Sequence, residues 1–498
     1  MRHILNSNTL RQLSFLEALF ATQNWQPVDS FAKELDCSSR ILRSDLLAIN
    51  ELYSPFHINV SQKNGILLEY PQNYSIDFIY ASILENSTEF QLLELLFFNN
   101  ALTLDDLTEE LYISSSSIHR TIKKINSKLA PLGFTIATSP YELKGDEAAI
   151  RFFFIHYFYE RYLGTASPIT IEQQTTIDRF IKLLARTLNI NLTFPDLKLI
   201  RLTIATGIIR IKNGHVQKHQ LETSEHPIFQ LLLKQTDAIQ RLADQFQLAI
   251  QPDDLIDLFY FFLRDDYALT VDYLYQSLVP ANPQIKKIVQ TIETSLDSLS
   301  QRLSIPLENK EFLTWEIYNV QRVFLIDNFI LFNKKKAFRQ NALAEYPLLI
   351  PLLRSELIQL TAVMEHKWTD SALDEVLYMI LIHWPNLNNK LEQFYATISI
   401  GIFCDYDTEH SDFLGQLITF HFGNSINITI LTAQTEREAL LEKQHYDLFI
   451  TNLSCFDPED AHVICINAVP TMHDWKNIQQ NIKRIAASQD FITTRFIH

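Results

Sequence analysis

Between Gly214 and Gly401 the sequence contains no glycine. Glycine supplies the positive φ angles of tight hairpin turns, so such a stretch favours packed helices joined by short turns over a sheet of hairpins. The whole chain has 9 glycines in 498 residues, whereas phosphate-binding loops such as G-x-G-x-x-G or G-x-x-x-x-G-K-[ST] need several close together. The sequence therefore argues against a Rossmann dehydrogenase, a P-loop NTPase and a protein kinase.

Charge and cysteine content narrow the class further. The chain has 42 basic and 58 acidic residues, a formal net charge of -16, so nucleic-acid binding requires a local basic surface. Its four cysteines form no recognised motif, which is typical of a reducing compartment. With neither a signal peptide nor an apolar run of about 18–20 residues, we expect a cytoplasmic protein without membrane contact.

The first 72 residues have the pattern of a winged helix-turn-helix. Two helices with apolar stripes are followed by a turn at Asp36-Cys37-Ser38 and a third helix, for which Ser38 or Ser39 is the predicted cap. Leu42, Leu46 and Ile49 lie on one face of this helix, opposite Arg40, Arg43 and Ser44. Residues 57–70, around Lys63-Asn64-Gly65, predict a two-stranded wing.

The same plan repeats in residues 73–162. Thr103 is placed to cap a short acidic helix ending near Leu111, and a third helix runs from Ser114 to Leu129 without an acidic residue. Its apolar face is Ile118, Ile122 and Ile125. Its other face carries Ser116, Arg120, Lys123, Lys124 and Ser127. Residues 132–144 predict a second wing.

Basic and hydroxyl side chains opposite a buried face suit the DNA major groove. A single such helix is more often an ordinary solvated basic face, but two successive units of the same design favour duplex DNA as the ligand. The candidate DNA-binding residues are Ser39, Arg40, Arg43, Ser44 and Lys63 in the first unit, and Ser116, His119, Arg120, Lys123 and Lys124 in the second.

Residues 165–395 predict two helical modules that share a loose plan and meet near Pro280 and Pro283. No spacing in this region indicates a catalytic set, a cofactor site or a metal site. His215 and His219 are best interpreted as surface histidines. His383, at the end of an apolar helix, is usually a structural residue in such a position.

The last hundred residues change to short β-type runs alternating with helices, which predicts a small, mainly parallel α/β domain. Cys404 ends the first of these strands and could be a nucleophile if its pKa were lowered. Asp405, Asp407 and Glu409 follow it, and these acids would raise the thiol pKa and repel phosphate. A buried inert cysteine is the better interpretation.

This order of modules resembles the Mga/AtxA family of bacterial transcription regulators. The most specific parts are Leu104-Asp105-Asp106-Leu107, Ile113-Ser114, Ile118-His119-Arg120-Thr121-Ile122, and the run from Ile208 to His215. The resemblance implies a mainly α, multidomain protein. Its domains would be 1–72 and 73–162, two winged helix-turn-helix domains; 163–280 and 281–393, two all-α regulation domains of the sugar phosphotransferase system (PRDs); and 394–498, a small α/β domain similar to the EIIB component.

The resemblance also implies regulation by phosphohistidine, and four positions can be compared. Counting from Arg210 and Arg322, the expected histidines fall on Thr203, near Phe261, and on Trp315, none of which can carry a phosphohistidine. A histidine remains near the fourth position, His383. Phosphorylation candidates are therefore His383 and Cys404, and the resemblance implies the carrier protein of the phosphotransferase system as a partner.

The sequence thus predicts a cytoplasmic DNA-binding protein without cofactor or catalytic activity, and the resemblance implies a regulator of virulence, surface or sugar-use genes. The resemblance implies a homodimer or higher oligomer involving the C-terminal domain. Two alternatives stay open: an RNA-binding antiterminator, which also carries paired regulation modules, and a phosphocarrier enzyme using Cys404.

Overall fold

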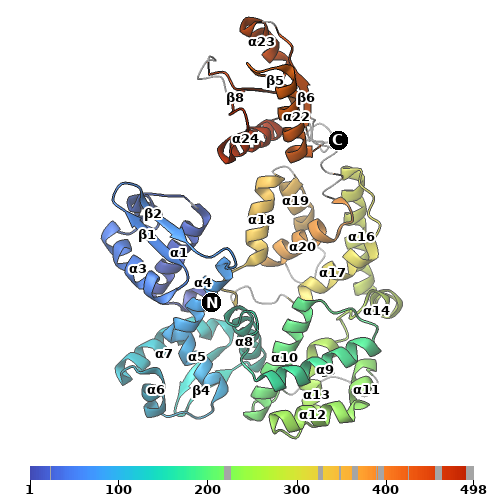
Figure 1. Cartoon of the computed structure of the whole chain (residues 1–498). Helices are drawn as coiled ribbons and strands as arrows, with labels where there is room; N and C mark the ends of the chain where they lie inside the picture. The colour runs from blue at the N-terminus through green and yellow to red at the C-terminus, as the bar shows by residue number, and fades with distance from the viewer. Residues whose placement is uncertain are drawn as a thin grey trace. The chain divides into compact units, whose positions relative to one another are not determined.

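The computed structural model describes residues 1–22, 24–217, 226–323, 329–346, 349–361, 368–387, 390, 398–423, 426–433, 435–454 and 462–488. The chain forms two compact units (Figure 1). The first unit comprises Met1–Leu269 and the described residues of Ile326–Asn333, and the second comprises Thr270–Leu325 and Lys334–His498.

The first unit begins with two winged helix-turn-helix folds. The first contains a 3-10 turn (Arg2–Ile4), α1 (Ser7–Thr22), α2 (Val28–Glu34), α3 (Ser39–Leu52), β1 (His57–Ser61) and β2 (Gly65–Glu69). The second follows α4 (Ile76–Asn86) and contains α5 (Thr88–Phe98), α6 (Leu104–Leu111), α7 (Ser115–Leu129), a 3-10 turn (Ala130–Leu132), β3 (Phe134–Thr138) and β4 (Tyr141–Gly145). Each strand pair is antiparallel, so both predicted wings are confirmed.

The remaining elements of the first unit are helical. They are α8 (Glu147–Arg161), α9 (Ile171–Thr187), α10 (Phe194–Lys212), α11 (Pro227–Leu233), α12 (Thr236–Phe246), α13 (Pro252–Phe259) and a 3-10 turn (Tyr260–Leu263). Helix α8 packs against β3 and β4 of the second winged helix and against α10. Through α8 the second winged helix and the first helical module are therefore joined in one body.

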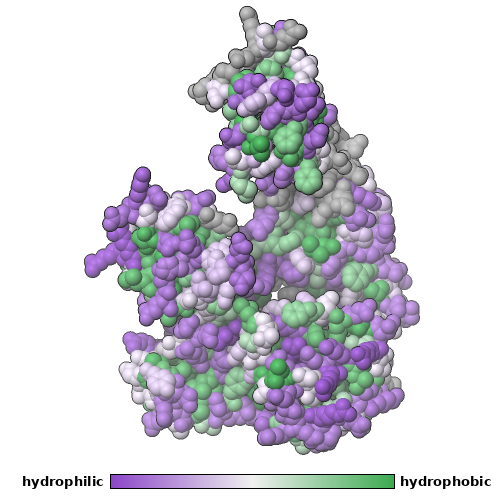
Figure 2. Space-filling model, in the orientation of Figure 1, coloured by the Kyte–Doolittle hydropathy of each residue, from purple (hydrophilic) through white to green (hydrophobic). Residues whose placement is uncertain are grey.

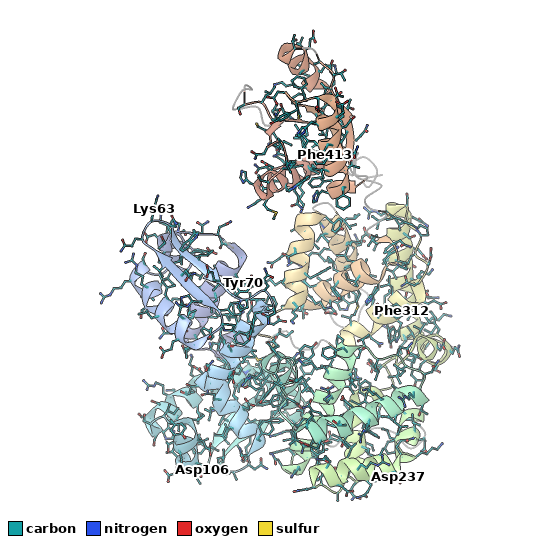
Figure 3. The ribbon with its side chains drawn as sticks, in the orientation of Figure 1. Lys63, Tyr70, Asp106, Asp237, Phe312 and Phe413 are labelled. Carbon is teal, nitrogen blue, oxygen red and sulfur yellow. The ribbon has the colours of Figure 1, made fainter. Side chains whose placement is uncertain are left out.

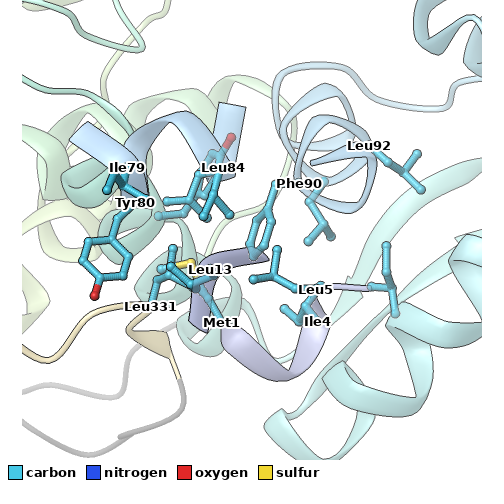
Figure 4. Packing of buried hydrophobic residues seen from close by; sticks show 14 of the residues in the cluster. Met1, Ile4, Leu5, Leu13, Ile79, Tyr80, Leu84, Phe90, Leu92 and Leu331 are labelled. Atoms are coloured by element: carbon cyan, nitrogen blue, oxygen red, sulfur yellow. The ribbon is translucent and has the colours of Figure 1, made fainter. Parts of the chain in front are cut away.

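One short segment of the first unit comes from far along the chain. Residues 329–333, here called the strap, lie in sequence between two helices of the second unit. Phe329 and Leu331 are buried in the core of the winged helices, where Leu331 lies beside Met1 and Leu13 (Figure 4). Leu331 N–H donates to Glu160 Oε2 at 2.9 Å, so both backbone and side chain hold the strap in place.

The helices of the second unit are α14 (Val271–Tyr273), a π-helical turn (Leu274–Leu278), α15 (Val279–Ala281), α16 (Pro283–Leu303), α17 (Lys310–Val323), α18 (Lys334–Glu345), α19 (Leu349–Leu360) and α20 (Asp370–His383). Asn282, between the two prolines, has extended backbone and caps α16 through its side chain. The predicted interruption of helix near Pro280 and Pro283 is confirmed.

The C-terminal α/β fold contains β5 (Ile398–Phe403), α22 (Thr408–Phe422), β6 (Ile426–Ile430), α23 (Glu436–Glu442), a 3-10 turn (Lys443–His445), β7 (Leu448–Thr451), β8 (Val463–Cys465) and α24 (Met472–Ser488). The strand order is β6-β5-β7-β8, and all three pairings are parallel. Gly401 in β5 leaves room for Tyr446, because a Cβ there would lie 2.7 Å from the ring. The prediction of a parallel α/β domain is confirmed.

The glycine-free stretch is helical in the parts of residues 215–400 that precede β5 and that the structure describes. Its left-handed turns are made without glycine, since Gln247, Ser304 and Asn386 take φ values of 53°, 51° and 59°. Each such residue costs backbone strain that the packing of the helices compensates.

Candidate nucleic-acid interface

The third helices of the two winged helices begin in the same way. Ser38 caps α3 by accepting a hydrogen bond from the Ile41 N–H at 3.4 Å. Ser114 caps α7 by accepting one from the Ser117 N–H at 3.3 Å. Residues of the two units therefore correspond when they lie at the same distance from Ser38 and from Ser114.

An asparagine joins each of these helices to its wing. Asn50, twelve residues after Ser38, donates to the Ile58 carbonyl at 3.0 Å and accepts from the Ile58 N–H at 2.7 Å. Asn126, twelve residues after Ser114, does the same with Ile136 at 2.8 and 2.7 Å. Each helix is therefore held to its wing by a pair of hydrogen bonds.

Sequence reasoning missed this asparagine pair, although the signal was available. The same residue type stands at the same distance from the capping serine in both repeats. The residues twelve positions before each capping serine also match. Gln26 forms an isolated antiparallel bridge with Ile66, and Leu102 forms one with Tyr141. The two units are thus duplicates at the level of individual backbone contacts.

In the first unit, Arg40, Arg43 and Ser44 are exposed on α3, while Leu42, Leu46 and Ile49 are buried. Ser39 is half-buried and donates to Asp29, so it is already engaged within the unit. Lys63 is exposed in the turn of the wing, at the rim of the unit (Figure 3). Hydrophilic side chains also project from this rim in the space-filling view (Figure 2).

In the second unit, four predicted residues form an exposed stripe on α7, namely Ser116, His119, Arg120 and Lys123. Lys124 is placed differently, because its Nζ donates to the Leu5 carbonyl at 3.2 Å and lies 3.6 Å from Oε1 of buried Glu89. This lysine is half-buried. It ties α7 to the start of the chain and lies off the exposed stripe.

The run from Ile208 to His215, one of the specific sequence signals, contains a buried ion-pair network. Arg210, 1% exposed, donates to the two oxygens of Glu147 at 2.8 and 2.7 Å. Arg151 donates to the same carboxylate at 3.1 Å and to both oxygens of Asp257 at 2.7 and 2.8 Å. Four charged groups thereby connect α8, α10 and α13.

The three positions compared with regulatory histidines are occupied by uncharged side chains. Thr203 donates to the Leu199 carbonyl at 2.9 Å. Phe261 packs against Tyr267, with ring centroids 4.6 Å apart. Trp315 packs against Phe312 at 5.5 Å. These residues serve helix structure and aromatic packing.

His383 ends α20 and lies against α17. Its Nδ1 is 2.6 Å from Glu316 Oε2, and its carbonyl accepts from Asn309 Nδ2 at 2.8 Å. Burial raises the pKa of Glu316. The His383 side chain is 35% exposed, so solvent reaches a ring that is held in position by a carboxylate.

Cys404, by contrast, is 7% exposed, and burial raises its thiol pKa. A protonated, buried thiol is a poor nucleophile, as expected for an inert cysteine. His219 lies outside the described residues. Among those described, no three His, Cys, Asp or Glu side chains gather closely enough to hold a metal ion. Within the same parts of the chain, no helix is long and apolar enough to cross a bilayer.

Comparison with known domain families decides the identity. Residues 6–65 match the M protein trans-acting positive regulator (MGA) HTH domain, and residues 72–158 match the Mga helix-turn-helix domain. Residues 173–387 match the M protein trans-acting positive regulator (MGA) PRD domain. The chain belongs to the Mga family of transcription regulators.

Similarity to individual proteins supports this assignment along the whole chain. The Mga-family regulator is 24% identical to a "Putative trans-acting regulator" of Streptococcus pneumoniae, over 95% of this chain and 97% of the relative. It is 20% identical to the capsule synthesis positive regulator AcpB of Bacillus anthracis, over 94% of this chain and 97% of the relative. It is 23% identical to the anthrax toxin expression trans-acting positive regulator of Bacillus anthracis, over 41% of this chain and 43% of the relative.

The sequence resemblance to the Mga/AtxA family is therefore confirmed. The Mga-family regulator has two helix-turn-helix DNA-binding domains and a PRD region, and it is not an enzyme. A phosphocarrier enzyme using Cys404 is excluded as its function.

Proposed function

We propose that this Mga-family regulator binds duplex DNA with both winged helices, through Arg40, Arg43 and Ser44 of α3 and the stripe Ser116, His119, Arg120 and Lys123 of α7. The observation that carries this proposal is the duplication. Both helices start from a capping serine, are held to a wing by an asparagine, and expose residues at the same spacing. Guanidinium and ammonium groups neutralise phosphates, and Arg, Ser and His also reach base edges.

The domain boundaries given above belong to this proposal, as do two separate PRDs, the EIIB-like assignment of the C-terminal domain and a cytoplasmic location. The extended backbone at Asn282, before α16, and the parallel order of the C-terminal sheet support the division. The names of the relatives, which describe positive regulators, support activation of transcription over repression. The helix-turn-helix matches favour DNA over RNA as the ligand.

Self-association through the C-terminal domain is also part of the proposal. Phe413 and Phe420, seven residues apart on α22, are 44% and 86% exposed and share one helical face. Phe413 lies at the edge of this domain (Figure 3). The double variant Phe413→Glu with Phe420→Glu should have a lower molar mass in light scattering than the oligomeric wild type. If the two molar masses are equal, this face is not the contact between subunits.

A gel-shift titration tests the DNA interface. The variant Arg120→Ala with Lys123→Ala should lose at least tenfold in affinity for duplex DNA, because two cationic contacts are removed. Lys182→Ala, an exposed lysine on α9, is the charge control and should bind as the wild type does. Equal affinity of the double variant and the control would eliminate α7 as a DNA-contacting helix. Duplex DNA should compete better than structured RNA for the wild type.

His383 is the proposed phosphorylation site, with the phosphotransferase carrier protein as donor. Glu316 holds the ring through Nδ1, so Nε2 is the nitrogen that would be phosphorylated. The phosphate would then add negative charge beside the buried Glu316 carboxylate. Transfer of radiolabelled phosphate from purified phosphorylated carrier protein should label the wild type and not His383→Ala. Equal labelling of both proteins would contradict the assignment.

A further inference from the structure

Leu47 on α3 is 76% exposed and lies within the basic surface of the first winged helix. It follows Arg40, Arg43 and Ser44 at the spacing 0, 3, 4 and 7 along the helix, so all four side chains project from one face. The third helix of a homeodomain contacts bases in the major groove through residues at this same spacing. Leu47 therefore occupies the fourth position of a stripe whose other members are polar.

The second unit carries a charged residue at the position that matches Leu47. Leu47 stands nine residues after the capping Ser38, and Lys123 stands nine residues after the capping Ser114. The buried positions are apolar in both helices, since Leu42, Leu46 and Ile49 correspond to Ile118, Ile122 and Ile125. The two helices thus have equivalent cores but differ at the end of the exposed stripe, where one carries a leucine and the other a lysine.

The surroundings of Leu47 indicate what it contacts. Arg40 and Arg43 flank it on the same face, which suits a polyanion and disfavours a purely apolar protein partner. Glu51, one turn further along this face, would be repelled by phosphate, so contact with DNA ends at Leu47. The apolar group that duplex DNA offers in its major groove is the C5-methyl group of thymine.

We propose that Leu47 packs against the C5-methyl group of a thymine and makes the first winged helix selective for that base. The inference rests on the proposed function, because α3 must lie in the major groove. It assigns different tasks to the two units: α3 discriminates bases by apolar contact, whereas α7, with Lys123 at the matching position, contributes mainly phosphate contacts.

The test uses full-length protein and duplexes selected from a random pool for binding to the wild type. Each thymine is replaced singly by deoxyuridine, which removes the methyl group and keeps base pairing. At one or more positions the wild type should lose about three- to fivefold in affinity, the value of one buried methyl group. Leu47→Ala should bind the thymine and deoxyuridine duplexes equally.

Two further variants act as controls. Lys123→Ala should weaken binding to every duplex and retain the wild-type preference for thymine. Leu47→Lys, which copies the second unit, should lose the thymine preference and show a salt dependence steeper by about one ion. Because Leu47 is exposed and alanine suits a helix, these variants should fold normally, as circular dichroism can verify.

The outcomes separate this inference from the proposed function. If wild type and Leu47→Ala respond alike to every substitution, the thymine contact is wrong while DNA binding stands. If the wild type binds no duplex of the pool, the proposed function itself is wrong.

Discussion

Arg210 Nη2 lies 2.7 Å from Glu147 Oε2, and this ion pair joins the second winged helix to the first helical module. Glu147 is in the first turn of α8, directly after the wing, and Arg210 is in the last turn of α10. The second winged helix and the first helical module therefore share a buried electrostatic contact.

Removal of the Glu147 charge should strongly destabilise the first unit. Glu147→Gln leaves Arg210 buried without its counter-ion, and breaking such a pair costs about 3–5 kcal/mol. Urea unfolding should show this loss, while Glu172→Ala, an exposed acid on α9, should change stability by less than about 0.5 kcal/mol. A similar small effect for both variants would mean that the network does not stabilise the unit.

Lys123 and Lys124 are neighbours in sequence but should behave differently. Lys123→Ala should reduce the slope of log K against log salt by about 1, because one phosphate contact is lost. Lys124→Ala should leave this slope unchanged and instead lower the melting temperature, since buried Glu89 loses its cationic partner. Salt titrations of both variants, with thermal unfolding, distinguish the two roles. Equal slopes for the two variants would contradict the placement of Lys124.

The Asn126 clamp should stabilise the second wing. Asn126→Ala removes two hydrogen bonds and leaves the Ile136 backbone groups without their partner, at a cost of about 2 kcal/mol. Hydrogen exchange at the Ile136 amide should accelerate accordingly. Asn126→Asp keeps the acceptor for the Ile136 N–H but sets a carboxylate oxygen against the Ile136 carbonyl, so it should be at least as destabilising. Unchanged exchange in Asn126→Ala would show that the wing is held by other contacts.

Tyr112 should be replaceable by glycine with a gain in stability. Its φ of 53° is unfavourable for a bulky residue, and its side chain is 92% exposed, so little packing is lost. Tyr112→Gly should raise the free energy of unfolding by about 0.5–1 kcal/mol. Asp36 lies at the equivalent turn of the first unit, with a φ of 49°. Asp36→Gly should gain less stability, because Asp tolerates the left-handed conformation better than Tyr does. Destabilisation by Tyr112→Gly would reveal a contact that the exposure does not suggest.

His156 should make stability fall at acidic pH. Burial lowers its pKa from 6.5 to about 4, so between these values the unfolded state binds a proton that the folded state does not, and stability is lost as pH falls. When the pH falls from 7 to 4.5, the free energy of unfolding of the wild type should decrease by roughly 2 kcal/mol more than that of His156→Gln. His156→Phe should give the same shift. A pH-independent difference for both would refute this origin.

How much could be predicted depended on the range of the interactions involved. The wings, the caps at Ser38 and Thr103 and the buried faces of α3 and α7 follow from local rules of periodicity and turn chemistry. The exposed residues of the two stripes followed for the same reason. The Asn50 and Asn126 clamps were within reach, but only by aligning the repeats, since asparagine has no fixed local role.

The sequence by itself determined the class of this protein: duplicated winged helices, helical modules without glycine turns, and a parallel α/β end, all readable from local patterns. Only the tertiary structure decided that Lys124 turns inward to Glu89, that Arg210 pairs with Glu147, and that the strap at Leu331 lies in the core of the winged helices. These contacts join residues 35 to more than 300 positions apart. Such pairings depend on how whole elements pack, and no local propensity encodes them.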